Sequence, residues 1–296
     1  MPDETIAELA PIKAIAKAKI NLTLHVGRII EDPEDAFFGY HPLDSLVGFA
    51  DVFDGLTVRP ADKTSLTIDG PFGAGLDTVD NNLILKAYKA VAEKAPLLPL
   101  HITLTKNLPV ASGIGGGSAD AAAMLRLLQG FADLPDDVWH EIALGLGADV
   151  PVCLLSKTTH MSGIGEDLRP CPSLGYVPCV LVNPGRAVST GAIFKTFDAG
   201  EVRETPRPQL ASGSLMARAK DGRNDLEPPA IATEPVIQTV LDILESQSGC
   251  DLARMSGSGA TCFGLFHSQK SANVAAEVIL KNNPDWWVVA TTIGDA

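Results

Sequence analysis

The sequence predicts a protein of the α+β class with two domains, and three observations carry this prediction. Its 296 residues are enough for one large domain or two ordinary ones. The 46% hydrophobic and 20% charged fractions are typical of a chain with a full core. Strand-like and helix-like patterns follow one another in the order β-β-α-β-loop-α-α and then β-α-α-β-β-α-β. We therefore expect two domains that each contain helices and strands.

The first element is a run of strict alternation at residues 12–26. Every even position is apolar, and most odd positions are polar, so the run is predicted to be one strand or two strands with a bend. Lys17, Lys19 and Asn21 then share the face opposite the core. Further strands are predicted at 43–58, 64–68 and 101–105, and a helix follows the capping run 80–82.

The later elements are predicted in the same way. Helices are expected at about 118–131, 136–146, 233–248 and 271–281, with Gly147 as the C-cap of the second. Extended segments are expected at 150–155, 176–182, 252–266 and 287–292, the third of these with a Gly-Ser turn in its middle. Residues 31–39 and 200–214 are expected to be loops.

A glycine-rich run between a strand and a helix is the strongest functional signal. It reads Pro109-Val110-Ala111-Ser112-Gly113-Ile114-Gly115-Gly116-Gly117-Ser118-Ala119. Four glycines let backbone amides approach a ligand, and the helix N-terminus adds a positive dipole end, so the run is suited to a triphosphate. A Walker A loop would need a lysine after its last glycine, and a dinucleotide fingerprint would need glycine at Ser118. Neither motif is present.

The run Pro109–Ala119 is similar to the ATP loop of the GHMP kinases, the family of galactose, homoserine, mevalonate and phosphomevalonate kinases. Ala18–Leu22 resembles the family's first motif, and Leu146–Pro151 resembles the segment that bears the catalytic aspartate. Met255–Thr261 resembles the third motif, a glycine turn. The resemblance covers nearly the whole chain.

This resemblance implies a fold and an activity. The fold is a two-domain GHMP-kinase-like one. Residues 1–170 would form an ATP-binding domain of the ribosomal protein S5 domain 2-like type, and residues 171–296 a ferredoxin-like α/β sandwich, with the active site in the cleft between them. The activity would be phosphorylation of a small-molecule hydroxyl, with ATP and Mg²⁺. Ser118 is the one candidate ligand for the metal, and no acidic ligand is assigned.

Two charged residues are the catalytic candidates that the resemblance implies. Asp149 would be the base for the substrate hydroxyl, at a point where a helix is expected to end and a strand to begin. Lys19 would be its charged partner, because an ammonium nearby keeps a carboxylate ionised and stabilises developing charge. Whether Asp149 removes the proton or only orients the hydroxyl is left open.

Four residues are candidates for substrate binding, namely Asn21, Tyr40, His41 and Phe194. Gly39–Leu46 and Arg223–Glu227 look like a family member that phosphorylates a cytidine-diphosphate sugar alcohol. Aromatic residues such as Tyr40 recognise single bases by stacking. Ordinary helix packing is an equal alternative for Phe194, and a helix cap is preferred for Asn224-Asp225. The acidic segment Glu31–Phe38 is longer than the family pattern leads us to expect.

Composition excludes several other classes. The net charge of −13 argues against a nucleic-acid partner, and no apolar run reaches the roughly 18 residues that span a bilayer. Five scattered cysteines without a C-x-x-C pair favour reduced thiols in the cytoplasm.

The alternative function is that of another kinase of the same family, acting on homoserine or a mevalonate derivative. The presence of Lys19 and Asp149 argues against a non-catalytic nucleotide-binding protein, because simple binding needs neither residue. The oligomeric state is left open.

Overall fold

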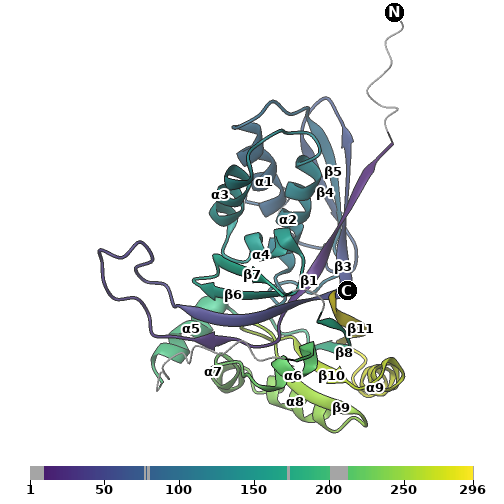
Figure 1. Ribbon diagram of the computed structural model, residues 1–296. Coiled ribbons are helices and arrows are strands. Elements are labelled where there is room, and N and C mark those ends of the chain that lie inside the picture. The colour runs from purple at the N-terminus through teal and green to yellow at the C-terminus, as the bar shows by residue number, and fades with distance from the viewer. Residues whose placement is uncertain (1–9, 77, 79–80, 172–173, 201–212, 296) are drawn as a thin grey trace, which may run out of the picture. The chain divides into compact units, whose positions relative to one another are not determined.

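The structure, a computed structural model, describes residues 10–76, 78, 81–171, 174–200 and 213–295 (Figure 1). The chain forms two compact units, each assembled from separate stretches of the sequence. Unit 1 contains Met1–Ala18, Val52–Val110 and Gly116–Leu155, and unit 2 contains Lys19–Asp51, Ala111–Gly115 and Ser156–Ala296. None of the helices in the described part of the chain is long and apolar enough to cross a bilayer.

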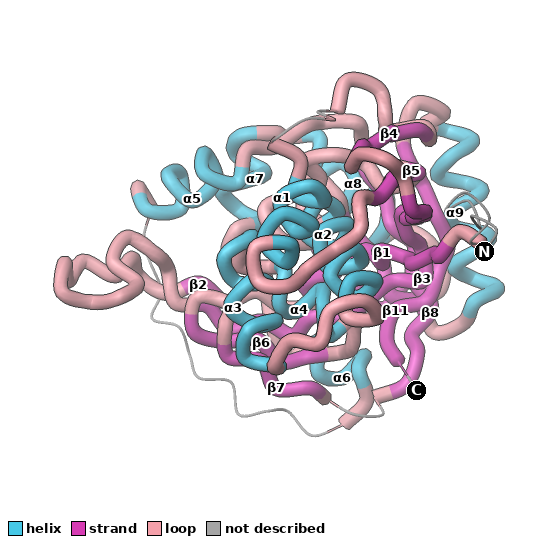
Figure 2. Tube along the Cα trace, turned by 90° about the horizontal axis from the view of Figure 1, so that it is seen from above, coloured by secondary structure: helices cyan, strands magenta, loops and turns pink. Residues whose placement is uncertain are grey.

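Unit 1 combines a small sheet with a group of helices. β4 (Ser65–Asp69) runs parallel to β5 (Leu100–Thr105), and β5 pairs antiparallel with the second half of β3 (Leu43–Pro60). The helices are α1 (Leu83–Ala92), α2 (Gly116–Leu128), α3 (Asp136–Leu146) and α4 (Val150–Leu155). α2 packs against the other three (Figures 1 and 2). Its buried alanines at 119 and 121–123 let the neighbouring helices approach closely.

The start of α1 confirms the predicted cap. The side chain of Asn82 accepts a hydrogen bond from the backbone N–H of Ile84 at 2.9 Å, which satisfies one of the free donors of the first turn. Ile84, Ala87 and Val91 lie on the buried face, as their spacing predicts.

Unit 2 contains a four-stranded antiparallel sheet in the order β11-β8-β10-β9. These strands are β8 (Gly175–Asn183), β9 (Cys250–Met255), β10 (Cys262–Phe266) and β11 (Trp287–Asp295). α8 (Val236–Glu245) connects to β9, and α9 (Gln269–Asn282) lies between β10 and β11 in sequence. This β-α-β-β-α-β order confirms the predicted ferredoxin-like sandwich.

The remainder of unit 2 surrounds this sandwich. β1 (Ile12–Asn21) enters it, and β2 (His25–Val26), β6 (Thr159–Gly163) and β7 (Asp167–Pro170) pair around the first half of β3. The shorter helices are α5 (Thr190–Asp198), α6 (Leu215–Lys220) and α7 (Glu227–Thr233). α5 and α7 lie side by side (Figure 2). Leu24 and Val26 join Val180, Ile237 and Phe266 in one apolar core.

Several predicted elements differ from the structure. Residues 150–155 are a helix, so the predicted extended segment is wrong. A short buried apolar run is compatible with a strand or with a helix. In the structure, the Arg126 guanidinium caps the C-terminal end of this helix, because it donates a hydrogen bond to the Cys153 carbonyl at 2.7 Å. α2 begins at Gly116, two residues before its predicted start. β6, β7, α6 and α7 were not predicted. Of the loop predicted at 200–214, residues 201–212 lie outside the described part.

The predicted domain boundary between residues 170 and 171 stays a prediction. Unit 2 takes residues from both sides of it, because Lys19–Asp51 and Ala111–Gly115 belong to this unit.

Candidate active site

Three segments that are far apart in sequence meet in unit 2. The backbone N–H of Lys19 donates to the Ile114 carbonyl at 3.0 Å, which joins the first motif to the glycine loop. The hydroxyl of Ser256 lies between them: it accepts from the Asn21 N–H at 3.1 Å and donates to the Gly113 carbonyl at 3.0 Å. The Thr261 N–H also donates to the Ser112 carbonyl at 3.1 Å. The first motif, the glycine loop and the third motif therefore form one hydrogen-bonded group.

In this hydrogen-bonded group, Gly113 is a position where a side chain would not fit. Its φ of 76° is in the left-handed region, and a Cβ there would lie 2.4 Å from the Ser256 carbonyl oxygen and 2.8 Å from the Gly259 nitrogen. Gly115 also has positive φ, at 64°. Gly116 and Gly117 instead form the first turn of α2, with Ser118. The prediction that the backbone amides of all four glycines approach a ligand stays a prediction.

The other predicted loop residues alternate between buried and exposed positions. Pro109, Ser112, Ile114 and Ala119 are buried, whereas Val110 and Ala111 are exposed. Ser118 is half-buried. The first-turn amides of α2 have no partner within a helix, so this end of α2 is suited to an anion.

A buried charge cluster in unit 1 holds the two ends of this loop, and sequence reasoning missed it. The Lys106 ammonium donates to Asp54 Oδ2 at 2.5 Å and to Asp120 Oδ2 at 2.6 Å. Asp54 Oδ1 accepts from the N–H groups of Asn107 and Leu108, at 2.6 and 2.8 Å. A Cβ on Gly116 would lie 3.2 Å from Lys106 Nζ. The cluster thus connects the chain entering the loop with the helix that leaves it.

The pKa values of Lys106 and Asp120 in this cluster are both raised. Burial raises the pKa of Asp120 to about 7, and the Lys106 ammonium opposes this rise. Burial alone would lower the pKa of Lys106, but the two carboxylates outweigh it and raise that pKa. One signal was available in the sequence: Asp54 stands at a buried position of the alternation that continues to Leu56 and Val58.

Lys19 and Asn21 share one face of β1, as predicted, but that face is not exposed. Lys19 is 3% exposed and Asn21 2%. Lys19 Nζ donates to Asn21 Oδ1 at 2.9 Å, and Asn21 Nδ2 donates to Ser45 Oγ at 2.8 Å. Ser45 in turn donates to the Thr23 carbonyl at 2.5 Å. This chain of hydrogen bonds sets the orientation of the amide beside the ammonium.

Asp149 belongs to unit 1 and lies between α3 and α4. Gly147 ends α3 with a φ of 154°, and the Asp149 carbonyl accepts from the Cys153 N–H at 3.1 Å in the first turn of α4. The expected helix-to-strand boundary at Asp149 is therefore wrong, because a second helix begins there. Its side chain is half-buried.

The predicted base-binding residues separate into two environments. Tyr40 is 54% exposed. The His41 ring packs against Phe194, with ring centroids 5.0 Å apart and an interplanar angle of 31°, and against the edge of Phe197 at 5.9 Å. His41 Nδ1 lies 2.9 Å from the Gly27 carbonyl, and Nε2 lies 3.3 Å from Asp198 Oδ1. The structure thus brings His41 and Phe194 together, and adds Phe197 and Asp198, which sequence reasoning missed.

The acidic segment Glu31–Phe38 forms a series of turns. Asp32 Oδ1 accepts from the Glu34 N–H at 3.0 Å, and Asp35 Oδ1 accepts from the Phe37 N–H at 2.8 Å. Backbone bonds between Ile30 and Tyr40 close the base of the segment. Two of its acidic side chains therefore stabilise its own backbone.

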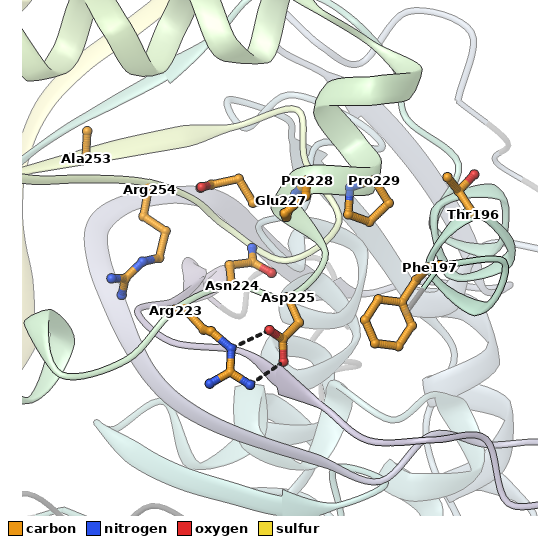
Figure 3. A pocket seen from close by; sticks show the side chains of 11 residues that line it. Thr196, Phe197, Arg223, Asn224, Asp225, Glu227, Pro228, Pro229, Ala253 and Arg254 are labelled. Atoms are coloured by element: carbon orange, nitrogen blue, oxygen red, sulfur yellow. Dashed lines mark hydrogen bonds and ion pairs between the residues drawn. The ribbon is translucent and has the colours of Figure 1, made fainter. Parts of the chain in front are cut away.

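A cavity of about 580 Å³ lies in unit 2, next to Phe197 (Figure 3). Arg223 faces Asp225 and makes two hydrogen bonds to it, at 2.5 and 3.1 Å (Figure 3). The Arg254 guanidinium donates to the carbonyls of Leu22, Ala219 and Gly222. The charges on these walls are therefore engaged in holding the fold.

Asn224, on the wall of the same cavity, supports the third motif. Its Nδ2 donates to the carbonyls of Met255 and Gly257, both at 2.8 Å, and its Oδ1 accepts from the Leu226 N–H at 2.9 Å. The residue in the cap position of α7 is Leu226, so the predicted helix cap is wrong in position.

The described residues offer few candidate protein ligands for a metal ion. Among the described residues, no group of three or more His, Cys, Asp or Glu side chains could hold a metal ion. Mg²⁺ carried by a nucleotide needs few protein ligands, because phosphates and water fill most of its sites. The Ser118 hydroxyl in the first turn of α2 fits that modest requirement.

Comparison with known proteins identifies the family. The family model described as GHMP kinases N terminal domain matches residues 82–157, and that described as GHMP kinases C terminal matches residues 208–285. The chain belongs to the GHMP kinase family, and the predicted fold class is confirmed. It is similar to a 4-diphosphocytidyl-2-C-methyl-D-erythritol kinase from Dinoroseobacter shibae, with 49% identity over 96% of this chain and 95% of the relative.

Solved structures agree. A crystal structure of 4-(cytidine 5'-diphospho)-2C-methyl-D-erythritol kinase is 31% identical, with a TM-score of 0.75, and the match covers 96% of this chain and 100% of that one. A homoserine kinase from Cytophaga hutchinsonii is 17% identical with a TM-score of 0.69, over 99% of this chain and 96% of that one. The second likeness shows the fold alone. The chain is an ATP-dependent small-molecule kinase.

Proposed function

We propose that this kinase phosphorylates a hydroxyl of 4-diphosphocytidyl-2-C-methyl-D-erythritol to give the 2-phosphate, a step in isoprenoid precursor biosynthesis. The observation that carries the proposal is the 49% identity, over nearly the full length, to a relative with this name. We further propose a cytoplasmic location, because all five cysteines are free thiols and four of them are buried. A homoserine or mevalonate-type kinase is the alternative, and it is supported by the fold alone.

Phosphoryl transfer needs the phosphates held in line and their charge neutralised. We propose that the loop Pro109–Ala119 and the N-terminus of α2 hold the triphosphate. The positive φ of Gly113 and Gly115 and the hydrogen bonds to Ser256 and Thr261 support this role. Bound Mg²⁺, with Ser118 as its candidate protein ligand, would neutralise phosphate charge.

We propose Lys19 and Asp149 as the catalytic residues. The near-complete burial of the Lys19 residue supports a functional role, because charged side chains are seldom buried outside functional sites and ion-pair networks. Asn21 would orient Lys19 through the 2.9 Å bond between them. Asp149 would orient the substrate hydroxyl or accept its proton. The resemblance to the family's aspartate segment supports this assignment.

We propose that Tyr40, His41 and Phe194 bind the cytosine. The contact between His41 and Phe194 supports a shared site for these two, and the exposed Tyr40 ring is available for stacking.

An ADP-release assay over a panel of alcohols tests the proposed function. The panel contains the cytidine-diphosphate sugar alcohol, homoserine and mevalonate, each with ATP and Mg²⁺. We expect the cytidine compound to give the highest kcat/KM. Faster turnover of homoserine or mevalonate would move the assignment to a sibling kinase.

A further inference from the structure

We propose that Ser45 is a positioning residue for phosphoryl transfer: its hydroxyl fixes the Asn21 amide with the oxygen toward Lys19, and so holds the Lys19 ammonium in place. The proposal rests on the catalytic role proposed above for Lys19. The contacts that carry it lie within Lys19–Asp51, one continuous stretch of unit 2.

The Ser45 hydroxyl has one proton, and its contacts decide where that proton lies. Oγ is 2.5 Å from the Thr23 carbonyl oxygen, which only accepts, so Ser45 donates to Thr23. Oγ then has only lone pairs left for its second contact, which is Asn21 Nδ2 at 2.8 Å. Ser45 therefore requires the NH₂ group of the Asn21 amide at this end.

The Lys19 ammonium sets the complementary requirement at the other end of the amide. An ammonium only donates, and Lys19 Nζ is 2.9 Å from Asn21 Oδ1. Turning the amide over would bring its NH₂ group to the ammonium and its oxygen to the lone pairs of Ser45, so both hydrogen bonds would be lost. The two contacts thus assign the same orientation independently.

The backbone around Ser45 keeps its hydroxyl in place. The Leu46 N–H donates to Thr23 Oγ1 at 2.8 Å, and the Leu46 carbonyl accepts from the Leu22 N–H at 2.8 Å. These bonds join the residue after Ser45 to the segment that carries Asn21 and Thr23. Ser45 is 0% exposed and Asn21 is 2% exposed, so water has little access to replace a lost partner.

Removing this hydroxyl would release the Asn21 amide. Nδ2 has no second acceptor among the described contacts, and a buried polar group without a partner is unfavourable. The terminal torsion of asparagine has broad preferences, so the amide would turn toward another acceptor and draw Oδ1 away from Lys19. An ammonium displaced from the reacting groups stabilises their developing charge less. The loss belongs to the chemical step, because the triphosphate and the cytosine are proposed to bind elsewhere.

The test compares the intact wild-type enzyme with Ser45→Ala, which removes the hydroxyl, and with Ser45→Thr, which keeps it. The matched control is Thr159→Val. This residue is also 0% exposed, it lies on β6 beside β3, and its hydroxyl donates to the Lys157 carbonyl at 2.8 Å. kcat and KM are measured for ATP and for the alcohol that the wild type prefers in the panel above. Urea unfolding records the stability of each variant.

For Ser45→Ala we expect kcat to fall about tenfold, the effect of one good hydrogen bond, while KM for ATP and KM for the alcohol stay unchanged. Ser45→Thr should recover most of the loss. Thr159→Val should keep the wild-type kcat even if its urea midpoint falls, because it removes a buried hydroxyl that bonds to Lys157 and not to Asn21.

A double-variant comparison separates positioning from a structural role. If Ser45 acts through Lys19, Ser45→Ala should lower kcat no further in a Lys19→Met background. A general loosening of the fold would instead lower kcat by the same factor in both backgrounds. The comparison does not depend on the threonine variant, so it decides the question even where the extra methyl group of Ser45→Thr disturbs the packing.

Three outcomes would overturn the proposal: an unchanged kcat in Ser45→Ala, an equal loss in both backgrounds, or a loss that lies mainly in KM. Near wild-type turnover in Lys19→Met would overturn it together with the role proposed for Lys19. Failure of the proposed substrate is a separate result, because the wild type would then prefer another alcohol of the panel and the comparison would be made with that alcohol.

Discussion

At the scale of single residues, the burial of Lys19 is the feature that most needs a reason. Lys19 is 3% exposed, so its side chain is largely removed from water, and Asn21 Oδ1 is one acceptor for its ammonium. Such positions are seldom kept for stability, because an apolar residue of similar size would usually serve better. The position is therefore a good place to test the proposed chemistry.

We predict that Asp149→Asn lowers kcat by roughly 10²–10⁴, the usual contribution of a positioned acid or base, while ATP still binds. Lys19→Met should cause a comparable loss, because it removes positive charge beside the reacting groups. The double variant should be little worse than either single one if the two act as a unit. Single-turnover rates and calorimetric ATP titrations provide the measurement.

Glu141→Gln is the control for this series, since it neutralises an exposed carboxylate on α3. Near wild-type turnover in Asp149→Asn would leave charge neutralisation and positioning as the whole mechanism.

Gly113 and Gly117 form a second residue-level comparison. Gly113→Ala should lower the free energy of unfolding by more than about 1–2 kcal/mol, the cost of left-handed backbone alone, because its Cβ also meets the Ser256 carbonyl. Gly117→Ala should keep or raise stability, since its Cβ would meet nothing closer than Leu83 Cδ1 at 3.7 Å and alanine favours a helix. Urea unfolding of both variants measures this. Equal stabilities would mean that the loop relaxes away from Ser256.

At the scale of elements, the start of α2 depends on the Lys106–Asp54–Asp120 cluster. Burial raises the pKa of Asp120 from 3.8 to about 7, so the folded state holds this proton more tightly than the unfolded chain does. The resulting stability is complete below about pH 4 and is lost as the pH rises toward 7. Asp120→Asn cannot ionise and should remove this part of the pH dependence.

Urea unfolding of the wild type and Asp120→Asn between pH 4.5 and pH 8.5, as chosen test conditions, checks this prediction. The stability of the wild type relative to the variant should be greatest at the acidic end. Asp137→Asn, at an exposed position of α3, is the control. A difference that stays constant with pH would show that Asp120 is ionised throughout this range.

Elements with clear periodicity could be predicted from the sequence, and short ones could not. The alternation of 12–26 and the apolar face of α1 each repeat often enough to identify the structure. The segment Val150–Leu155 is only six residues long, and its helix depends on packing against α2 and α3 and on Arg126. Such tertiary contacts override local preference.

At the scale of the whole molecule, the sequence identified the motifs but not how they meet. Resemblance located the segments around Lys19, Gly113 and Ser256, yet the bonds that join them connect residues 95 to 235 positions apart along the chain. Long-range hydrogen bonds leave no periodic pattern. The same holds for Asp198, whose contact with His41 depends on where α5 lies.

The interleaved units lead to a prediction about the predicted boundary between residues 170 and 171. The core of unit 2 contains Leu24 and Val26, and the Arg254 guanidinium donates to the Leu22 carbonyl at 2.6 Å. A fragment of residues 171–296 would lack the apolar contacts of Leu24 and Val26, and its Arg254 guanidinium would lose one of its three carbonyl partners while keeping those of Ala219 and Gly222. We expect this fragment alone to show no cooperative thermal transition and to bind hydrophobic dyes.

Co-expression with residues 1–170 should restore a single cooperative transition and ATP binding, because it returns strand β2 and the first half of β3 to unit 2. Circular dichroism melts and size-exclusion chromatography distinguish the two states. A sharp transition in the isolated fragment would instead mean that the sandwich of β8–β11 folds without the N-terminal strands. In that case the 170/171 boundary would describe an autonomous folding unit, and the contributions of Leu22, Leu24 and Val26 would be additions to a core that is already sufficient.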